Sequence, residues 1–344
     1  MKNRSSLPKG YSVFFVAVVL SMMIAQLFVP GMTLESISVD YLWRKDLIKL
    51  FNGFKYQIGD RVFPQSVVGK DGWLYYTAEL SMQDYQKVSP LNMGNTKRLT
   101  KILEKIKHQT EQYGGVFLVV IPPDKSTVYP QYMPDEIPVI GQISSLDRLM
   151  DYLNKNSDVQ VLDLRPIFST MGKSTQLYYK TDTHWNCQGA FYASNEILSI
   201  ISDSYPQIQP YALDDFEFSP STPSVRDISS MMGIDLREDF INPIPKSDLH
   251  IPKLTMENAN DKIPSLRVSV NEQTDLPSLV VFRDSFYECM DVFVEPKFSS
   301  TMSMHFKDAE LNDYLDIIAA EKPDVVIVEF VERSMDFFYR HLNN

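Results

Sequence analysis

Basic residues are in the minority in this sequence. Lysine and arginine together number 33 against 44 aspartates and glutamates, which gives the 344-residue chain a formal net charge of -11 and a pI near 5.0. Nucleic-acid binders normally carry a concentrated basic face, so this balance argues against nucleic acid as a partner. An anionic polymer binds only where a local basic patch overcomes the overall repulsion.

Cysteine is scarce as well. The two cysteines, Cys187 and Cys289, match no CxxC pattern of a metal or redox site. We predict neither a metal ion nor a cofactor for this protein. Two states remain open for the pair, because a disulfide is allowed outside the cytoplasm whereas two free buried thiols fit the sequence equally well.

Charged residues are missing from positions 11–29, YSVFFVAVVLSMMIAQLFV, a run long enough to cross a bilayer as a helix. Basic residues precede this run, and it contains no A-x-A cleavage pattern of the kind that ends a signal peptide. We therefore predict a single-pass signal anchor in the inner (cell) membrane rather than a cleaved peptide. The positive-inside rule leaves residues 1–10 in the cytoplasm and places the chain beyond residue 30 in the periplasm or another extracytoplasmic space.

The rest of the chain has the composition of a globular protein, with 44% hydrophobic and 22% charged residues overall. Residues 30–66 mix hydrophobic and charged side chains, and we interpret them as a stalk. A glycine-containing turn at 69–72 then separates two short apolar runs, which indicates a β-hairpin. One domain is predicted from residue 67 to residue 344.

Helical patterns alternate with short apolar runs from residue 95 onward. Apolar residues at helical spacing predict helices over 95–113, 145–153, 186–201 and 308–320. A continuous apolar run predicts a buried strand at 116–121, and further apolar-rich runs predict strands at 159–164, 279–282 and 325–330. The alternation is typical of an α/β domain with a mainly parallel sheet. Residues 204–276 show no strong periodicity, and no element is predicted there.

An acid precedes a histidine by two residues at Asp182 and His184. In an extended segment residues i and i+2 point to the same side, so the carboxylate can lie against the imidazole. An imidazole held by a carboxylate is the base half of a nucleophilic triad. The nucleophile must then come from another part of the chain.

Ser285 is the obvious candidate for that nucleophile. Ligands of parallel α/β sheets sit beyond the carboxyl ends of the strands, and Ser285 follows the apolar run 279–282 at a strand-to-helix turn. Its hydroxyl can be exposed there, and its own N–H can point at a developing oxyanion. Acyl transfer needs a nucleophile, a base and an orienting acid from different elements, so the two weak motifs reinforce each other.

These motifs resemble a known family, the alginate O-acetyltransferases of the AlgJ and AlgX type in the SGNH hydrolase-like superfamily. The resemblance rests on TDTHW at 181–185, Gly189-Ala190, RDSF at 283–286, VGKDGWL at 68–74 and PDK at 123–125. In most SGNH enzymes the serine block comes first, whereas here the serine comes last, which is similar to the circularly permuted order of this family. The resemblance spans roughly residues 60–335 and implies an SGNH hydrolase-like three-layer α/β sandwich with a mainly parallel sheet.

The family resemblance also implies a reaction. Ser285 would be the nucleophile, His184 the general base and Asp182 its orienting acid, and acetyl groups would pass through an acetyl-serine intermediate to hydroxyls of an exopolysaccharide, alginate or another. It further implies a membrane-bound O-acyltransferase as acetyl supplier. Two rival functions stay open: an acetyl esterase, and a non-catalytic carbohydrate-binding subunit of an export complex.

Four further residues are candidates for substrate binding. Arg283 and Lys125 either attract an anionic substrate at the site rim or form salt bridges. Trp185 either stacks on a sugar ring or packs in the core. The usual glycine and asparagine oxyanion donors of SGNH enzymes have no clear match in this sequence, and Gly233 is the candidate for the second donor.

Overall fold

The computed structural model describes residues 44–246, 249, 251–252, 254–258 and 263–343, together with residues 17 and 21. The predicted anchor at 11–29 therefore lies, but for those two residues, outside the described part of the chain and stays a prediction. Among the described residues, no helix combines the length and the apolar character needed to cross a membrane.

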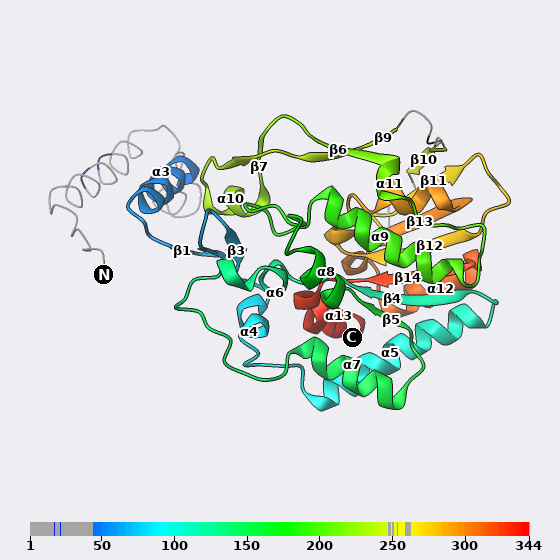
Figure 1. Ribbon diagram of the computed structural model, residues 1–344. Coiled ribbons are helices and arrows are strands. Elements are labelled where there is room, and N and C mark those ends of the chain that lie inside the picture. Colours follow the sequence, from blue (N-terminus) through cyan, green and yellow to red (C-terminus); the bar gives the residue numbers. More distant parts are fainter. Residues whose placement is uncertain are drawn as a thin grey trace, which may run out of the picture.

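A seven-stranded sheet forms the centre of the described structure, in the order β10-β11-β13-β12-β14-β4-β5 (Figure 1). The strands from β13 to β5 run parallel, while β10 and β11 add an antiparallel edge. The mainly parallel sheet confirms the predicted α/β class. The strands are β4 Val116–Ile121, β5 Val161–Asp163, β10 Leu254–Asn258, β11 Arg267–Asn271, β12 Ser278–Arg283, β13 Ser300–His305 and β14 Val325–Glu329.

Helices cover both faces of the sheet, because side chains that alternate along each central strand feed two separate hydrophobic cores (Figure 1). One core joins the sheet to α8, α9 and α11, and the other joins it to α5, α7, α12 and α13. The larger helices are α5 Met93–Glu111, α7 Ser145–Asn156, α8 Arg165–Met171, α9 Cys187–Ser202, α12 Leu311–Glu321 and α13 Met335–Leu342, and α11 Asp291–Val294 is a single turn.

A three-stranded antiparallel sheet lies beside the main domain, formed by β1 Val62–Phe63, β2 Ser66–Val68 and β3 Leu74–Tyr76. The β2–β3 pair confirms the predicted hairpin, and Gly72 in its turn has a φ of 80°, which glycine adopts without strain. Helix α3, Arg44–Gln57, is attached to helix α10, Asp227–Met232. The buried Asn52 side chain of α3 donates to the carbonyl of Met232 in α10 at 2.7 Å. The boundary that we drew at residue 66 thus falls inside this sheet.

Several elements were absent from the sequence prediction. β13 has the sequence STMSMH, which contains no apolar run, yet it lies between β11 and β12 with Thr301 and Ser303 buried. Segment 204–276 holds α10 Asp227–Met232, β10 and β11 together with two short antiparallel pairs. These pairs are β6 Phe216–Pro220 with β9 Ile241–Pro245, and β7 Ser224–Val225 with β8 Arg237–Glu238.

Candidate active site

Two neighbouring parallel strands, β12 and β14, end at the same edge of the sheet, and a short turn follows each. Ser285 begins the 3-10 turn after β12, as predicted from its place behind the apolar run. The Asp284 carboxylate accepts the Phe286 N–H at 2.7 Å and the Val331 N–H at 2.8 Å. It therefore fixes the serine turn against the turn that follows β14.

The structure brings the three predicted triad residues together. His184 Nε2 lies 2.7 Å from Ser285 Oγ, although 101 residues separate the two in the chain. His184 Nδ1 lies 2.7 Å from Asp182 Oδ1, and the same oxygen accepts the His184 backbone N–H at 3.0 Å. This is the arrangement in which a carboxylate orients an imidazole that can remove a serine proton. Ser285 and His184 line a pocket of about 180 Å³, large enough for a small acyl group.

The charges around the imidazole favour its protonated form. Burial lowers the pKa of His184, but the hydrogen bond and the charge of Asp182, helped by Asp227, outweigh it and raise that pKa above 6.5. Burial raises the pKa of Asp182, but the hydrogen bonds and charge of His184 prevail and hold it well below its usual range. Asp182 is thus an ionised partner throughout the neutral range.

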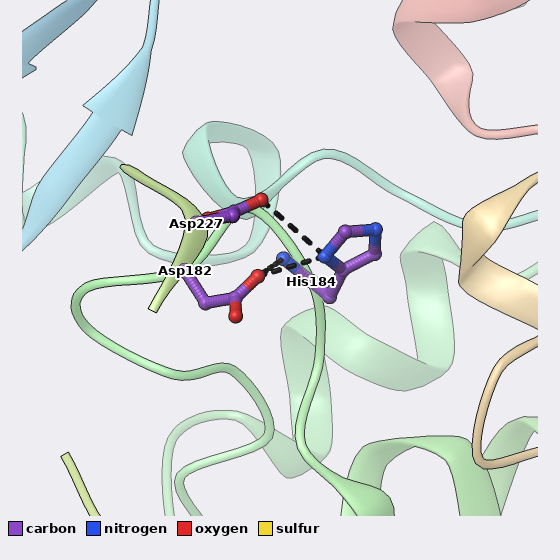
Figure 2. A group of neighbouring side chains, drawn as sticks. All are labelled: Asp182, His184 and Asp227. Carbon is purple, nitrogen blue, oxygen red and sulfur yellow. Dashed lines mark hydrogen bonds and ion pairs between the residues drawn. The ribbon is translucent and has the colours of Figure 1, made fainter. Parts of the chain in front are cut away.

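Asp227 is a second carboxylate on the same imidazole, and the sequence analysis missed it. It begins α10, Asp227–Met232, and its Oδ2 lies 3.5 Å from His184 Nδ1 (Figure 2). The same carboxylate accepts the Thr183 N–H at 2.7 Å and the Thr183 hydroxyl. Nothing in segment 204–276 marks this aspartate, because its role depends on how α10 packs against the Asp-x-His loop.

Lys125 lies beneath that loop rather than at the rim of the site, which corrects our expectation. It begins the short helix α6, Lys125–Val128, and is only 4% exposed. Its Nζ donates to the carbonyls of Tyr179, Lys180 and Asp182 at 3.1, 3.0 and 2.5 Å. Burial lowers the pKa of Lys125 to about 8, against the opposing charges of nearby carboxylates. The ammonium therefore shapes the loop that carries the acid and the base.

The three other residues that we predicted to bind substrate are buried or already hydrogen-bonded within the protein. Trp185 is 3% exposed and packs against the rings of Phe168 and Phe286, so it offers no face to a sugar. Arg283 is the last residue of β12 and is buried, and its Nη1 donates to the Asp284 carbonyl. Gly233 ends α10 with a φ of 68°, and its N–H already donates to the Ser230 carbonyl at 2.9 Å.

The two cysteines form a disulfide, which decides between the two states left open by the sequence. Cys187 begins α9 three residues after His184, and Cys289 follows Ser285 by four residues. The Cα atoms of the pair are 5.5 Å apart, and the bridge closes a separation of 102 residues. It therefore ties the segment of the base to the turn of the nucleophile.

Two groups of described residues have the donor atoms that a metal ion would need. One is Asp182, His184 and Asp227. His184 Nδ1 already pairs with both carboxylates, and Asp227 accepts the Thr183 hydroxyl. The other is Asp84, Asp124 and Glu332, where Asp124 pairs with Arg333 and Glu332 lies 3.8 Å from Arg165. Because both groups already have hydrogen-bonding or cationic counterparts in the protein, we assign a metal to neither.

A serine, histidine and aspartate at the carboxyl edge of a three-layer α/β sandwich define the site class of SGNH hydrolase-like proteins. The family model for the SGNH hydrolase-like domain of the acetyltransferase AlgX matches residues 67–259. The chain belongs to this family.

Curated relatives are similar to part of the chain. The probable alginate O-acetylase AlgJ of Pseudomonas syringae pv. tomato is 23% identical over 210 residues, which cover 60% of this chain and 49% of that protein. The Pseudomonas fluorescens protein of the same name is 26% identical over 168 residues, which cover 48% and 38%. The chain thus spans about half the length of these relatives, or less.

Solved structures share the fold. Bacillus cereus PatB1, in a structure with a sulfonyl adduct, aligns with a TM-score of 0.59 and 15% identity over 80% of this chain and 99% of that one. A DHHW family protein from Eubacterium siraeum aligns with a TM-score of 0.58 and 15% identity over 80% and 93%. At such identities the likeness concerns the fold alone.

Proposed function

We propose that this protein is an O-acetyltransferase that transfers acetyl groups to hydroxyls of an exopolysaccharide through an acetyl-Ser285 intermediate. The observation that carries the proposal is the 2.7 Å contact between His184 Nε2 and Ser285 Oγ, with Asp182 on the opposite ring nitrogen. The curated relatives named as alginate O-acetylases support a polysaccharide as acceptor, alginate or another.

The first half-reaction acylates the serine. Asp182 accepts a hydrogen bond from His184 Nδ1–H, which leaves the lone pair of Nε2 facing the serine hydroxyl. Ser285 Oγ bonds to the acetyl carbonyl carbon while His184 takes the serine proton, and the π electrons move onto the carbonyl oxygen. When they return, the bond to the donor's leaving group breaks, and that group departs with the proton from His184.

The second half-reaction releases the acetyl group to the sugar. A sugar hydroxyl enters in place of the leaving group and gives its proton to His184 as its oxygen bonds to the acyl carbon. The tetrahedral intermediate collapses, the Ser285 ester bond breaks, and the serine oxygen takes the proton back from His184. Water in place of the sugar would make the protein an esterase, so the entry of the acceptor decides between the two activities.

We also propose that the domain works outside the cytoplasm, held at the inner membrane by residues 11–29. The uncharged run and the basic residues before it support this position, and so does a disulfide next to the site, since disulfides persist in oxidising compartments. An acetyl donor must then be supplied across the membrane, for which a membrane-bound O-acyltransferase is the partner that we propose.

The proposal is tested by Ser285→Ala and His184→Ala in the full chain. We expect each to lower turnover of p-nitrophenyl acetate by at least about 10³-fold, since a triad loses most of its rate with any one member. Ser334→Ala is the matched control, because this serine lines the same pocket without touching His184. Near-native turnover in either triad variant would contradict the assignment.

The acceptor is tested with polymer. Incubation with an acetyl donor and unacetylated alginate should yield acetylated polymer, whereas acetylated alginate should lose little acetyl. Net loss of acetyl from the second polymer, without gain in the first, would make the protein an esterase. Polymer binding that survives Ser285→Ala, with no acetyl transfer by the native protein, would make it a carbohydrate-binding subunit.

A further inference from the structure

Acyl transfer needs at least two donors for the oxygen that becomes negatively charged in the tetrahedral intermediate. The N–H of Ser285 stands at the start of the 3-10 turn beside the nucleophile. The N–H of Gly233, which the sequence suggested as the second donor, is already bound to the Ser230 carbonyl. A second donor must therefore come from another element that faces the pocket.

We propose that Arg333 is this donor, and that its guanidinium binds the acyl oxygen as negative charge develops on it. The inference rests on the proposed acyl transfer at Ser285. When the nucleophile adds, the π electron pair of the C=O bond moves onto the oxygen, and the guanidinium charge stabilises it there. The pair forms the C=O bond again when the leaving group departs.

Arg333 comes from the strand next to that of the nucleophile. It follows β14, whereas Ser285 follows β12, and the two strands are paired in parallel. The Asp284 carboxylate binds the Val331 N–H at 2.8 Å, so the two turns are held in one register. Arg333, Ser285 and His184 line the same pocket of about 180 Å³. Arg333 therefore borders the pocket that Ser285 and His184 also line, which is the space available to the acyl group.

The guanidinium lies close to two aromatic rings. Its centre lies 5.3 Å from the Phe286 ring and 5.4 Å from the Tyr76 ring, and the side chain is 8% exposed. The His184 ring packs on the same Phe286 ring at 4.9 Å between centroids. One aromatic side chain, adjacent to the nucleophile, thus positions both the base and the cation.

Part of the hydrogen-bonding capacity of Arg333 is unused. Nη1 donates to Asp124 at 2.5 Å, which anchors the fork from one end. Nε is fully buried without a hydrogen-bond acceptor among the described residues, and it lies 3.9 Å from a Glu79 carboxylate oxygen. Nη2 also has no hydrogen-bond acceptor in the described part of the chain, and it is not among the fully buried atoms, so it is the donor that a ligand in the pocket can meet.

The charge state of Arg333 also suits this role. Burial lowers its pKa, but the charge and the hydrogen bond of Asp124 prevail and raise it, so the guanidinium stays charged. Its positive charge opposes protonation of His184, which helps to keep the base free. A fixed cation in a site shielded from water stabilises a developing oxyanion without reorganising at the moment of reaction.

The test compares Arg333→Met with Arg237→Met in the full chain. Arg237 is paired with an aspartate, as Arg333 is, but its side chain is 59% exposed and is not part of the pocket lining. We expect Arg333→Met to lower kcat for p-nitrophenyl acetate about 100- to 1000-fold with KM little changed, as loss of an oxyanion donor does elsewhere. Arg237→Met should change kcat by less than about threefold, since an exposed charge is screened.

A boronic acid gives an independent readout, because its adduct with serine carries the tetrahedral charge. Ethylboronic acid should inhibit Arg333→Met at least about 100-fold more weakly than the native protein. Arg333→Lys is the second variant, for the case in which Arg333→Met does not fold, because lysine keeps a positive charge opposite Asp124. We expect it to lower kcat at least about tenfold, since an ammonium lacks the planar guanidinium donors.

A folded arginine variant with native kcat and native boronate affinity would overturn the proposal. So would a loss of activity that matches the loss of folded protein, since Arg333 would then serve only to neutralise Asp124. Neither readout needs a polysaccharide, so this test still applies if the protein fails to acetylate a polymer. Failure of the proposed acyl transfer itself would be recognised separately, because Ser285→Ala would then keep the native turnover of p-nitrophenyl acetate.

Discussion

His184 is the residue on which most of the site converges. Its Nδ1 has Asp182 at 2.7 Å, the Thr183 hydroxyl at 3.1 Å and Asp227 at 3.5 Å, while its Nε2 faces Ser285. Asp182 accepts a hydrogen bond from Nδ1–H, and Asp227 accepts hydrogen bonds from the Thr183 backbone and hydroxyl beside it. The second carboxylate therefore acts on the base through charge and through the loop rather than by contact with substrate.

Removal of the Asp227 charge should change the pH dependence of the reaction. Asp227 raises the pKa of His184, so Asp227→Asn should lower that pKa and shift the acidic limb of the kcat/KM profile toward lower pH. The asparagine oxygen can still accept the Thr183 N–H. Asp235→Asn, at an exposed aspartate paired with Arg237, is the control and should leave the profile in place. An unshifted limb in Asp227→Asn would show that this carboxylate does not act on the base.

The residues that the sequence revealed are those with a local signature. Asp182 and His184 were found because i, i+2 spacing in an extended segment is a property of the segment itself. Ser285 was found because strand ends define ligand sites in parallel sheets. Asp227 has no such signature, since its role depends on how α10 packs beside the Asp-x-His loop. Lys125 and Arg333 do follow the ends of β4 and β14, but their partners depend on distant segments that pack beside them.

At the level of elements, the disulfide joins helix α9 to the turn after β12. In the chain-entropy model a loop of about 100 residues is worth about 4 to 5 kcal/mol, and removal of a native disulfide typically costs about 2 to 5 kcal/mol. Reduction, or the double substitution Cys187→Ser with Cys289→Ser, should lower the free energy of unfolding by that amount.

Urea unfolding with and without dithiothreitol measures the effect of this bridge. The native chain should show a lower midpoint in the reductant, and the double-serine variant should show the low midpoint in both conditions. Equal midpoints for the oxidised and reduced native chain would mean that the packing of α9 and the serine turn stabilises the protein without the bridge.

Elements with one strong pattern were predicted, and elements that depend on their neighbours were not. The apolar runs of β4, β12 and β14 and the amphipathic helix α5 follow from burial on one or two faces. β13, with the sequence STMSMH, has polar residues at alternate positions, and Thr301 and Ser303 are buried because the strand pairs with β11 on one side and β12 on the other. Such pairing cannot be seen in a single strand.

The whole molecule is predicted to have a fixed orientation across a membrane. A cysteine placed at Lys155, whose side chain is 67% exposed on α7, should react in cells with a maleimide that does not cross the inner membrane. A cysteine at Lys2 should react only after the membrane is permeabilised. The two native cysteines are paired and give no background. The reverse pattern would place the domain in the cytoplasm and remove the need for a donor supplied across the membrane.

The class of the fold followed from the alternation of helices and strands, a property of the chain as a whole. The antiparallel edge and the small sheets did not, because segment 204–276 acquires its structure by packing on the domain.

The bridge between Cys187 and Cys289 makes maturation of the protein sensitive to where it folds. A copy stranded in a reducing compartment keeps two thiols, and it is the less stable form by the few kcal/mol that the crosslink contributes. Proteases remove poorly stable chains sooner, so copies with the bridge should persist longer than copies without it. The crosslink would thereby favour protein that folds in an oxidising compartment.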